Sequence, residues 1–198
     1  MEFKELYEKY EDLLNKLKEI IIQSQQRVLA EDPDEIFSNN VNFFVKSYLI
    51  NTCTYLEAYL QDIALEHTSR ISSRLKSISV PHNFLYWRLA KDVKDKDKNL
   101  SFEIAEYKVS KKELSDSISG NPYKTIKAFR LIGIDLNSNE KFQKNKDVIS
   151  SIVIKRNNII HHNDDASDIS FSDLLLNIDV FLDYMASIEE TVTSVNEI

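Results

Sequence analysis

The sequence is poor in the residues that form tight turns, with 2 glycines and 3 prolines among 198 residues. Hairpin-rich β architecture needs many turns with positive φ, which glycine adopts at the lowest cost, so that class of fold is disfavoured. Long helices need few such turns. We therefore expect an all-α protein, and the length suits a single helical domain over residues 1–198.

A single cysteine, Cys53, excludes an intrachain disulfide. It lies at helical spacing from Leu49 and Leu56, which is typical of a small core residue rather than of a nucleophile. The sequence shows no Cys/His pattern with metal-ligand spacing, no basic-then-apolar N-terminal segment and no apolar run that could span a membrane. We expect a cytoplasmic protein with no membrane contact and no cofactor.

The net charge of −7 argues against a protein that coats nucleic acid non-specifically, because that mode needs a broad basic surface. A local binding site is not excluded. Positive charge gathers towards the C-terminal end of the chain, at Lys141, Lys144, Lys146, Lys155 and Arg156.

Apolar residues recur at three- and four-residue spacings, which predicts long helices over about residues 2–30, 41–76 and 138–162, and a last helix from about residue 170. Asp34 after the first helix, and Ser170 with Asp173 before the last, are typical capping residues. The expected fold is an up-and-down bundle of long antiparallel helices with residues 41–76 as its spine. The first helix should turn inward Phe3, Leu6, Tyr7, Tyr10, Leu13, Leu14, Leu17, Ile20 and Ile21.

Residues 81–135 show weaker periodicity and are predicted as an irregular middle insertion. Within them, the nearly continuous charge of residues 91–98 indicates a solvated loop. Asn121-Pro122 should open a helix that ends at Gly133. Two histidines, His67 and His82, have no partner at a recognisable spacing, and we expect them at the surface.

The segment from Arg156-Asn157 to His161-His162 carries the most chemistry, because it places a guanidinium, an amide and an imidazole near the end of a helix. Such a set suits a phosphodiester substrate. On an ideal helix Asn157 and His161 are offset by about 40° and share a face, whereas Arg156 and His161 are about 140° apart. One chain alone therefore does not easily bring the arginine and the histidine together.

The run His161-His162-Asn163-Asp164-Asp165 also suggests a metal site, since imidazole and carboxylate bind divalent ions. Adjacent histidines rarely point the same way, however. A helix C-cap followed by the next N-cap explains the run more simply, and we expect no metal.

The spacing Arg-polar-x-x-x-His, on one of the last long helices of a small all-helical chain, resembles the signature of the HEPN superfamily, many of whose members are metal-independent RNases. The segment from Val41 through Leu56-Glu57-Ala58 looks like the long second helix of certain HEPN families. In those families an acidic residue of this stretch packs beside the Arg/His helix. The chain looks closest to the stand-alone HEPN families, of which the RiboL-PSP type is one.

The resemblance implies an endoribonuclease that works as a homodimer, with Arg156 of one chain near His161 of the other. An RNA 2′-hydroxyl would attack the adjacent phosphate and leave a 2′,3′-cyclic phosphate. By this resemblance, His161 is the general base or acid, Arg156 stabilises the phosphorane, and Asn157 orients the phosphate or its helix partner by hydrogen bonding. Glu57 would be a supporting residue that holds Arg156 or His161 in place.

Small stand-alone members of the superfamily commonly serve as growth-arrest toxins or prokaryotic defence effectors, so the resemblance also implies such a role, with a cognate antitoxin protein as a partner to look for. The alternative is a non-catalytic HEPN-like module that dimerises or binds a partner. The position of Arg156 bears on this choice. A solvent-open cleft at a dimer axis favours the enzyme, and burial against Glu57 within one chain favours the module.

Overall fold

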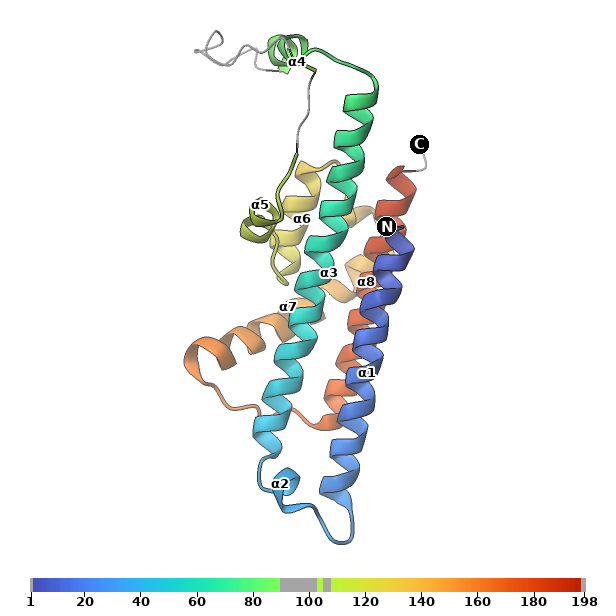
Figure 1. The fold of residues 1–198 in the computed structure, drawn as a ribbon. Coiled ribbons are helices and arrows are strands. Elements are labelled where there is room, and N and C mark those ends of the chain that lie inside the picture. Colours follow the sequence, from blue (N-terminus) through green and yellow to red (C-terminus); the bar gives the residue numbers. More distant parts are fainter. Residues whose placement is uncertain (1, 90–102, 105–107, 197–198) are drawn as a thin grey trace.

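The computed structural model describes residues 2–89, 103–104 and 108–196. Three long helices lie side by side in Figure 1: α1 (Phe3–Leu29), α3 (Val41–Ser77) and α8 (Phe171–Asn196). Both ribbon views show α1 running antiparallel to the other two. The described residues form no strand beyond an isolated bridge between Pro81 and Ile104. The prediction of an all-α bundle with long antiparallel helices is confirmed.

The spacing of apolar residues explains why these helices pack together. α1 buries a stripe that includes Leu6, Leu14 and Ile21. Ile20 was wrongly expected to face inward, because it lies at the edge of this stripe and its side chain is 50% exposed. α3 contacts α1, α5 (Lys111–Ser117), α7 (Glu140–His162) and α8, and is the predicted spine. The buried apolar residues of the described part of the chain form one cluster.

Side-chain caps fix the ends of the helices where the sequence predicts them. The carboxylate of Asp34 accepts a hydrogen bond from the backbone N–H of Ile36 and caps the single-turn helix α2 (Glu35–Ser38). At the start of α8, the backbone N–H of Ser170 donates to Asp173 at 2.8 Å, and the N–H of Asp173 donates back to Ser170 Oγ at 3.1 Å. None of the described helices is both long and apolar enough to cross a membrane.

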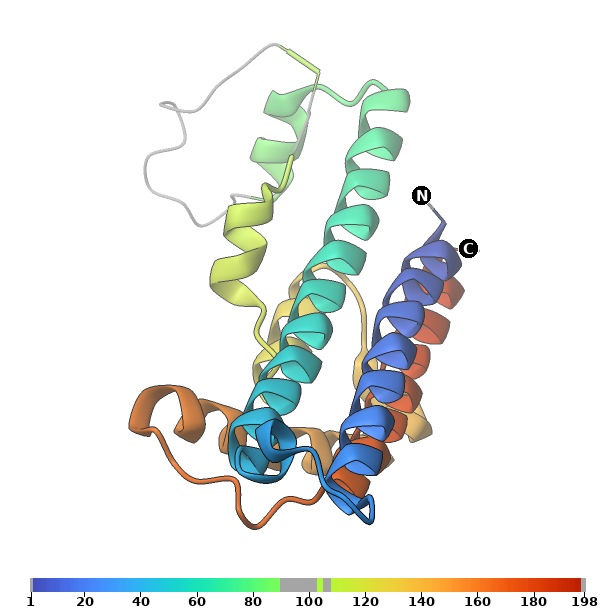
Figure 2. The ribbon, with the colours of Figure 1, turned by 60° about the horizontal axis from the view of Figure 1, so that its bottom comes forward.

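The helix that carries the chemical motif, α7 (Glu140–His162), lies across the bundle rather than along it, as Figures 1 and 2 both show. Asn139 caps its first turn, and Asn163 ends it in the left-handed conformation with a φ of 52°. Arg156 and His161 therefore both belong to the helix, in its last two turns.

Residues 81–135, predicted as an irregular insertion, contain three helices in their described part: α4 (His82–Leu89), α5 (Lys111–Ser117) and α6 (Pro122–Leu131). Leu114, Ile118 and Phe129 are buried and join α5 and α6 to the core. This segment is thus part of the packed structure beside α3 and α7. The charged run 91–98 lies outside the described residues.

The predicted limits of α6 are confirmed. Pro122 occupies its first turn, where a missing N–H costs nothing, and the side chain of Asn121 caps it. The chain leaves the helix through Gly133, whose φ of +84° is a conformation that other residues adopt only with strain.

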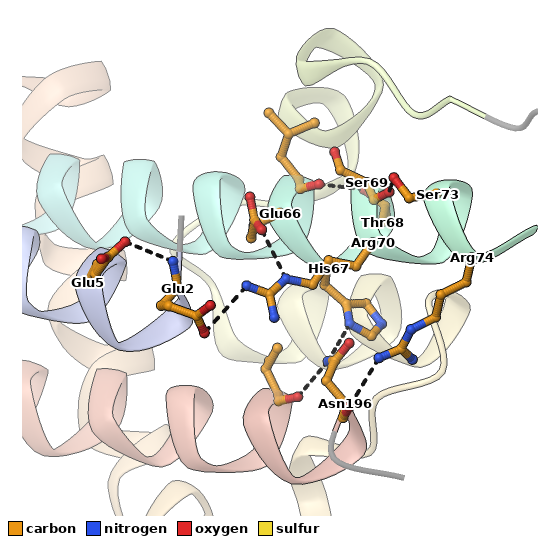
Figure 3. Close-up of polar contacts among 12 residues, drawn as sticks. Glu2, Glu5, Glu66, His67, Thr68, Ser69, Arg70, Ser73, Arg74 and Asn196 are labelled. Carbon is orange, nitrogen blue, oxygen red and sulfur yellow. Dashed lines mark hydrogen bonds and ion pairs between the residues drawn. The ribbon is translucent and has the colours of Figure 1, made fainter. Parts of the chain in front are cut away.

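His67 was wrongly expected at the surface, since only 3% of it is exposed. Figure 3 shows its ring between α3 and the end of α8. Its Nε2 lies 2.9 Å from the carbonyl oxygen of Ile132, and its Nδ1 lies 2.9 Å from Asn196 Nδ2. A carbonyl only accepts, so Nε2 donates and Nδ1 accepts from the amide, which makes the ring neutral. Arg74 adds a hydrogen bond to the backbone oxygen of Asn196.

We expect the free energy of unfolding to fall as the pH drops below about 6.5, the ordinary pKa of histidine. Burial lowers the pKa of His67 in the folded protein. The unfolded state therefore binds more protons in this range, and stability rises with pH until His67 is neutral in both states. Urea unfolding between pH 5 and about pH 7.5 measures the effect. His67→Gln should flatten this part of the profile, while the control His162→Gln should not. If His67→Gln leaves the dependence of the unfolding free energy on pH unchanged, the conclusion that His67 is buried and neutral is wrong.

Candidate functional site

The site is centred on an ion pair where α7 crosses α3. Arg156 Nη2 lies 3.0 Å from Glu57 Oε2, and Arg156 Nη1 donates to Asn157 Oδ1 at 3.0 Å. The side chains of Arg156 and Glu57 are 19% and 30% exposed. The structure thus brings together three of the four residues that the sequence singled out.

The buried residues around Arg156 on α7 explain why this ion pair forms. Ile152, Val153 and Ile159 are the buried positions around Arg156 on α7, so the arginine sits on the face that packs against α3. A guanidinium in such a place needs an anion nearby, because an unpaired charge is costly away from water. Glu57, on the facing side of α3, provides it.

Cys53 lies one turn before Glu57 on α3 and is buried, as predicted for a core residue. Burial raises the pKa of its thiol to about 12, although the charge of Arg156 acts in the opposite direction. The thiol therefore stays protonated near neutral pH and is a poor nucleophile.

A cavity of about 150 Å³ opens beside the ion pair. It is lined by α3, by α7, and by the turn before α6 together with the first turn of that helix. The lining residues are Cys53, Glu57, Ser119, Gly120, Asn121, Lys124, Val153, Arg156 and Asn157.

His161 does not join this cavity. It is exposed near the end of α7, and neither its side chain nor that of His162 makes a hydrogen bond or ion pair within the described part of the chain. The structure agrees with the ideal-helix geometry, in which Arg156 and His161 point in different directions. Within a single chain, the arginine and the histidine are therefore separate.

The segment after His162 behaves as a cap and connection. Asn163 accepts a long hydrogen bond from Lys46 at 3.5 Å, and the backbone N–H of Ala166 donates to Asn42 at 3.0 Å. Within the described residues, no three His, Cys, Asp or Glu side chains gather closely enough to hold a metal ion.

Sequence reasoning missed the third wall of the cavity. Ser119, Gly120 and Lys124 come from the segment whose periodicity is weak, more than thirty residues before Arg156. The one available signal was Asn121-Pro122, which marks the start of a helix and therefore a place where polar groups converge.

The chain belongs to the RiboL-PSP-HEPN family, whose pattern it matches over residues 3–194. This match covers nearly the whole chain, including α5 and α6. It confirms the resemblance to the HEPN superfamily that Arg156, His161 and the Glu57 segment suggested. No curated protein and no solved structure matches the chain.

We expect Glu57 and Arg156 to be coupled by about 1–2 kcal/mol, between the values typical of exposed and of fully buried ion pairs. A double-mutant cycle of Glu57→Gln, Arg156→Met and the double variant, followed by urea unfolding, measures the coupling. The exposed pair of Asp12 and Lys16, joined at 2.7 Å, is the control and should show no measurable coupling. Equal coupling in the two pairs would contradict a special role for the Glu57 ion pair.

Proposed function

We propose that the protein is a metal-independent endoribonuclease of the HEPN type that acts in the cytoplasm as a toxin or defence effector. The observation that carries the proposal is the Arg156-Asn157-x-x-x-His161 motif, with Arg156 held by Glu57 and His161 exposed one turn beyond Asn157. Family membership supports it, since HEPN domains are generally linked to RNA cleavage and nucleotide-related functions.

In this reaction a base removes the proton of an RNA 2′-hydroxyl, and the 2′-oxygen forms a bond to the adjacent phosphorus. The bond from phosphorus to the 5′-oxygen breaks, and an acid gives that oxygen a proton. Histidine suits both proton transfers near neutral pH. Arg156 would stabilise the additional negative charge of the phosphorane.

Glu57 and Asn157 would act by positioning Arg156. Each uses one acceptor oxygen on a different Nη atom of the guanidinium. A guanidinium has five N–H donors in a rigid fork, so both contacts leave donors for a phosphate. Holding the fork in place before substrate binds lowers the entropic cost of the reaction.

A second copy of the chain would complete the site. In an isologous dimer the exposed face of α7 meets itself, and His161 of one protomer can approach Arg156 of its partner. This face carries Ile154, which is 52% exposed and lies one to two turns before Asn157 and His161. An exposed isoleucine beside the motif suits such a contact.

The alternative is a non-catalytic HEPN-like module that dimerises or binds a partner. It is favoured by one observation: Arg156 is largely buried and paired with Glu57 inside a single chain. The cavity beside Arg156 and the exposure of His161 favour the enzyme. Measuring RNA cleavage by variants of Arg156 and His161 distinguishes the enzyme from the non-catalytic module.

We expect RNA cleavage that persists in excess chelator and leaves 2′,3′-cyclic phosphate ends. Arg156→Lys and His161→Ala should each lower kcat by about a hundredfold or more. The control is His162→Ala, which should cost little because residue 162 projects about 100° away from residue 161. End-group analysis identifies the products. Cleavage rates are compared among variants whose helix content, measured by circular dichroism, matches that of the parent. Products with 3′-hydroxyl ends would contradict the mechanism. Full activity of Arg156→Lys would contradict the role of Arg156 in catalysis and would favour the alternative, a non-catalytic binding module.

Mixing the two inactive variants tests whether the site spans two chains. A heterodimer of Arg156→Lys and His161→Ala protomers contains one pairing of an intact arginine with an intact histidine. We expect partial recovery of cleavage on mixing. The control mixes each variant with itself at the same total concentration, and toxicity on expression should follow the same pattern.

We expect a homodimer in solution whose contact includes the exposed face of α7. Ile154→Arg should shift it towards monomer and lower the rate of cleavage in parallel, because a charge would be buried in the contact. Light scattering across micromolar concentrations measures the association. Ile20→Arg is the matched control, since Ile20 is 50% exposed on α1, away from the motif. A parent protein that stays monomeric would remove the composite site.

A further inference from the structure

The cavity beside Arg156 has an unusual excess of hydrogen-bond donors. Asn157 accepts from Arg156 through Oδ1, and Asn121 accepts from the backbone N–H groups of Tyr123 and Lys124 through its own Oδ1. These contacts fix the orientation of both amides, because only the oxygen can accept. Each NH₂ group is left without a protein partner among the described residues.

The remaining polar groups of the lining can also donate hydrogen bonds. Ser119 Oγ accepts from the backbone N–H of Asn121 at 3.4 Å, which leaves its O–H free to donate. The exposed ammonium of Lys124 makes no ion pair or hydrogen bond with the described residues. The one carboxylate in the lining, Glu57, already pairs with Arg156.

The balance of charge also favours an anion. Two cations and one carboxylate line the cavity, so its net charge is positive in a chain whose overall net charge is −7. The lining also includes Cys53 and Val153, both buried. Charges act more strongly beside such an apolar surface than in open water.

The size and shape of the cavity indicate what kind of anion fits. Its volume of about 150 Å³ is well below the roughly 300 Å³ at which pockets for drug-sized ligands begin, so a whole nucleoside does not fit. A phosphate group does. Gly120 lies close to α7 at this wall, since a Cβ at this position would lie only 3.3 Å from Val153 Cγ2.

We propose that this cavity binds a backbone phosphate of RNA next to the one that is cut, and that Lys124 is the residue that holds it. The proposal rests on the proposed function for the identity of the polymer. Lys124 would contribute equally to the ground state and the transition state, because it contacts a phosphate that does not react. It is thus a substrate-positioning residue and not a catalytic one.

The test measures binding without cleavage. A fluorescent single-stranded 2′-O-methyl RNA lacks the attacking hydroxyl, and its anisotropy gives Kd over a series of salt concentrations. Lys124→Ala should weaken binding about tenfold and reduce the slope of log K against log salt by about 0.7, the value for one phosphate of a single strand. Lys124→Arg should retain the Kd and the salt slope of the parent. Lys127→Ala, on the same helix and outside the cavity, removes the same charge and should change neither.

Cleavage of ordinary RNA by the same variants provides a second readout. Lys124→Ala should raise KM about tenfold and leave kcat within about twofold of the parent. If Lys124→Ala and Lys127→Ala behave alike in Kd and in salt slope, or if the parent does not bind the oligonucleotide, the phosphate site is overturned. If binding depends on Lys124 but the parent cleaves no RNA, the phosphate site stands and the nuclease proposal fails.

Discussion

The ion pair of Arg156 and Glu57 is the constraint on which the rest of the site depends. α7 needs an apolar face to cross α3, and Arg156 lies within that face. Only an anion on α3 makes this crossing tolerable, and Glu57 supplies it at 3.0 Å. Once the crossing is fixed, the turn before α6 closes a cavity on one side of Arg156, and the end of α7 directs His161 outward. The crossing of α7 over α3, the cavity beside Arg156 and the exposure of His161 therefore all depend on the ion pair of Arg156 and Glu57.

The overall charge of the chain limits how it can bind RNA. A net charge of −7 repels phosphates over most of the surface, so binding energy for RNA would have to come from a few cations. In the proposed phosphate site these are Arg156 and Lys124, beside the apolar side chains of Cys53 and Val153. Under the proposed function, affinity for RNA would be modest and strongly dependent on salt, and selectivity would come from geometry rather than from non-specific attraction.

The helices could be predicted from the sequence because they are local. Three- and four-residue spacing places the long helices, and Ser170, Asp173 and Pro122 mark their ends. Contacts between distant residues could not be predicted in the same way. His67 was misplaced because its partners, Ile132 and Asn196, lie 65 and 129 residues away. For the site, the resemblance to HEPN families supplied Glu57 as a support for Arg156 or His161, and the structure shows that it pairs with Arg156. No pattern supplied Ser119 or Lys124, because the turn before α6 and the first turn of α6 become part of the site only when α6 packs against α7.

The proposed function divides the work between two copies of the chain. Under this proposal, one chain by itself would hold phosphate, since Arg156, Asn157 and the cavity all belong to one chain. It would not cut RNA, because His161 does not line the cavity beside Arg156. A protomer below its dimerisation concentration would thus bind RNA without cleaving it. Any protein that covers the exposed face of α7 near Ile154 would have the same effect without entering the cavity, and this face is where a cognate antitoxin would act most directly.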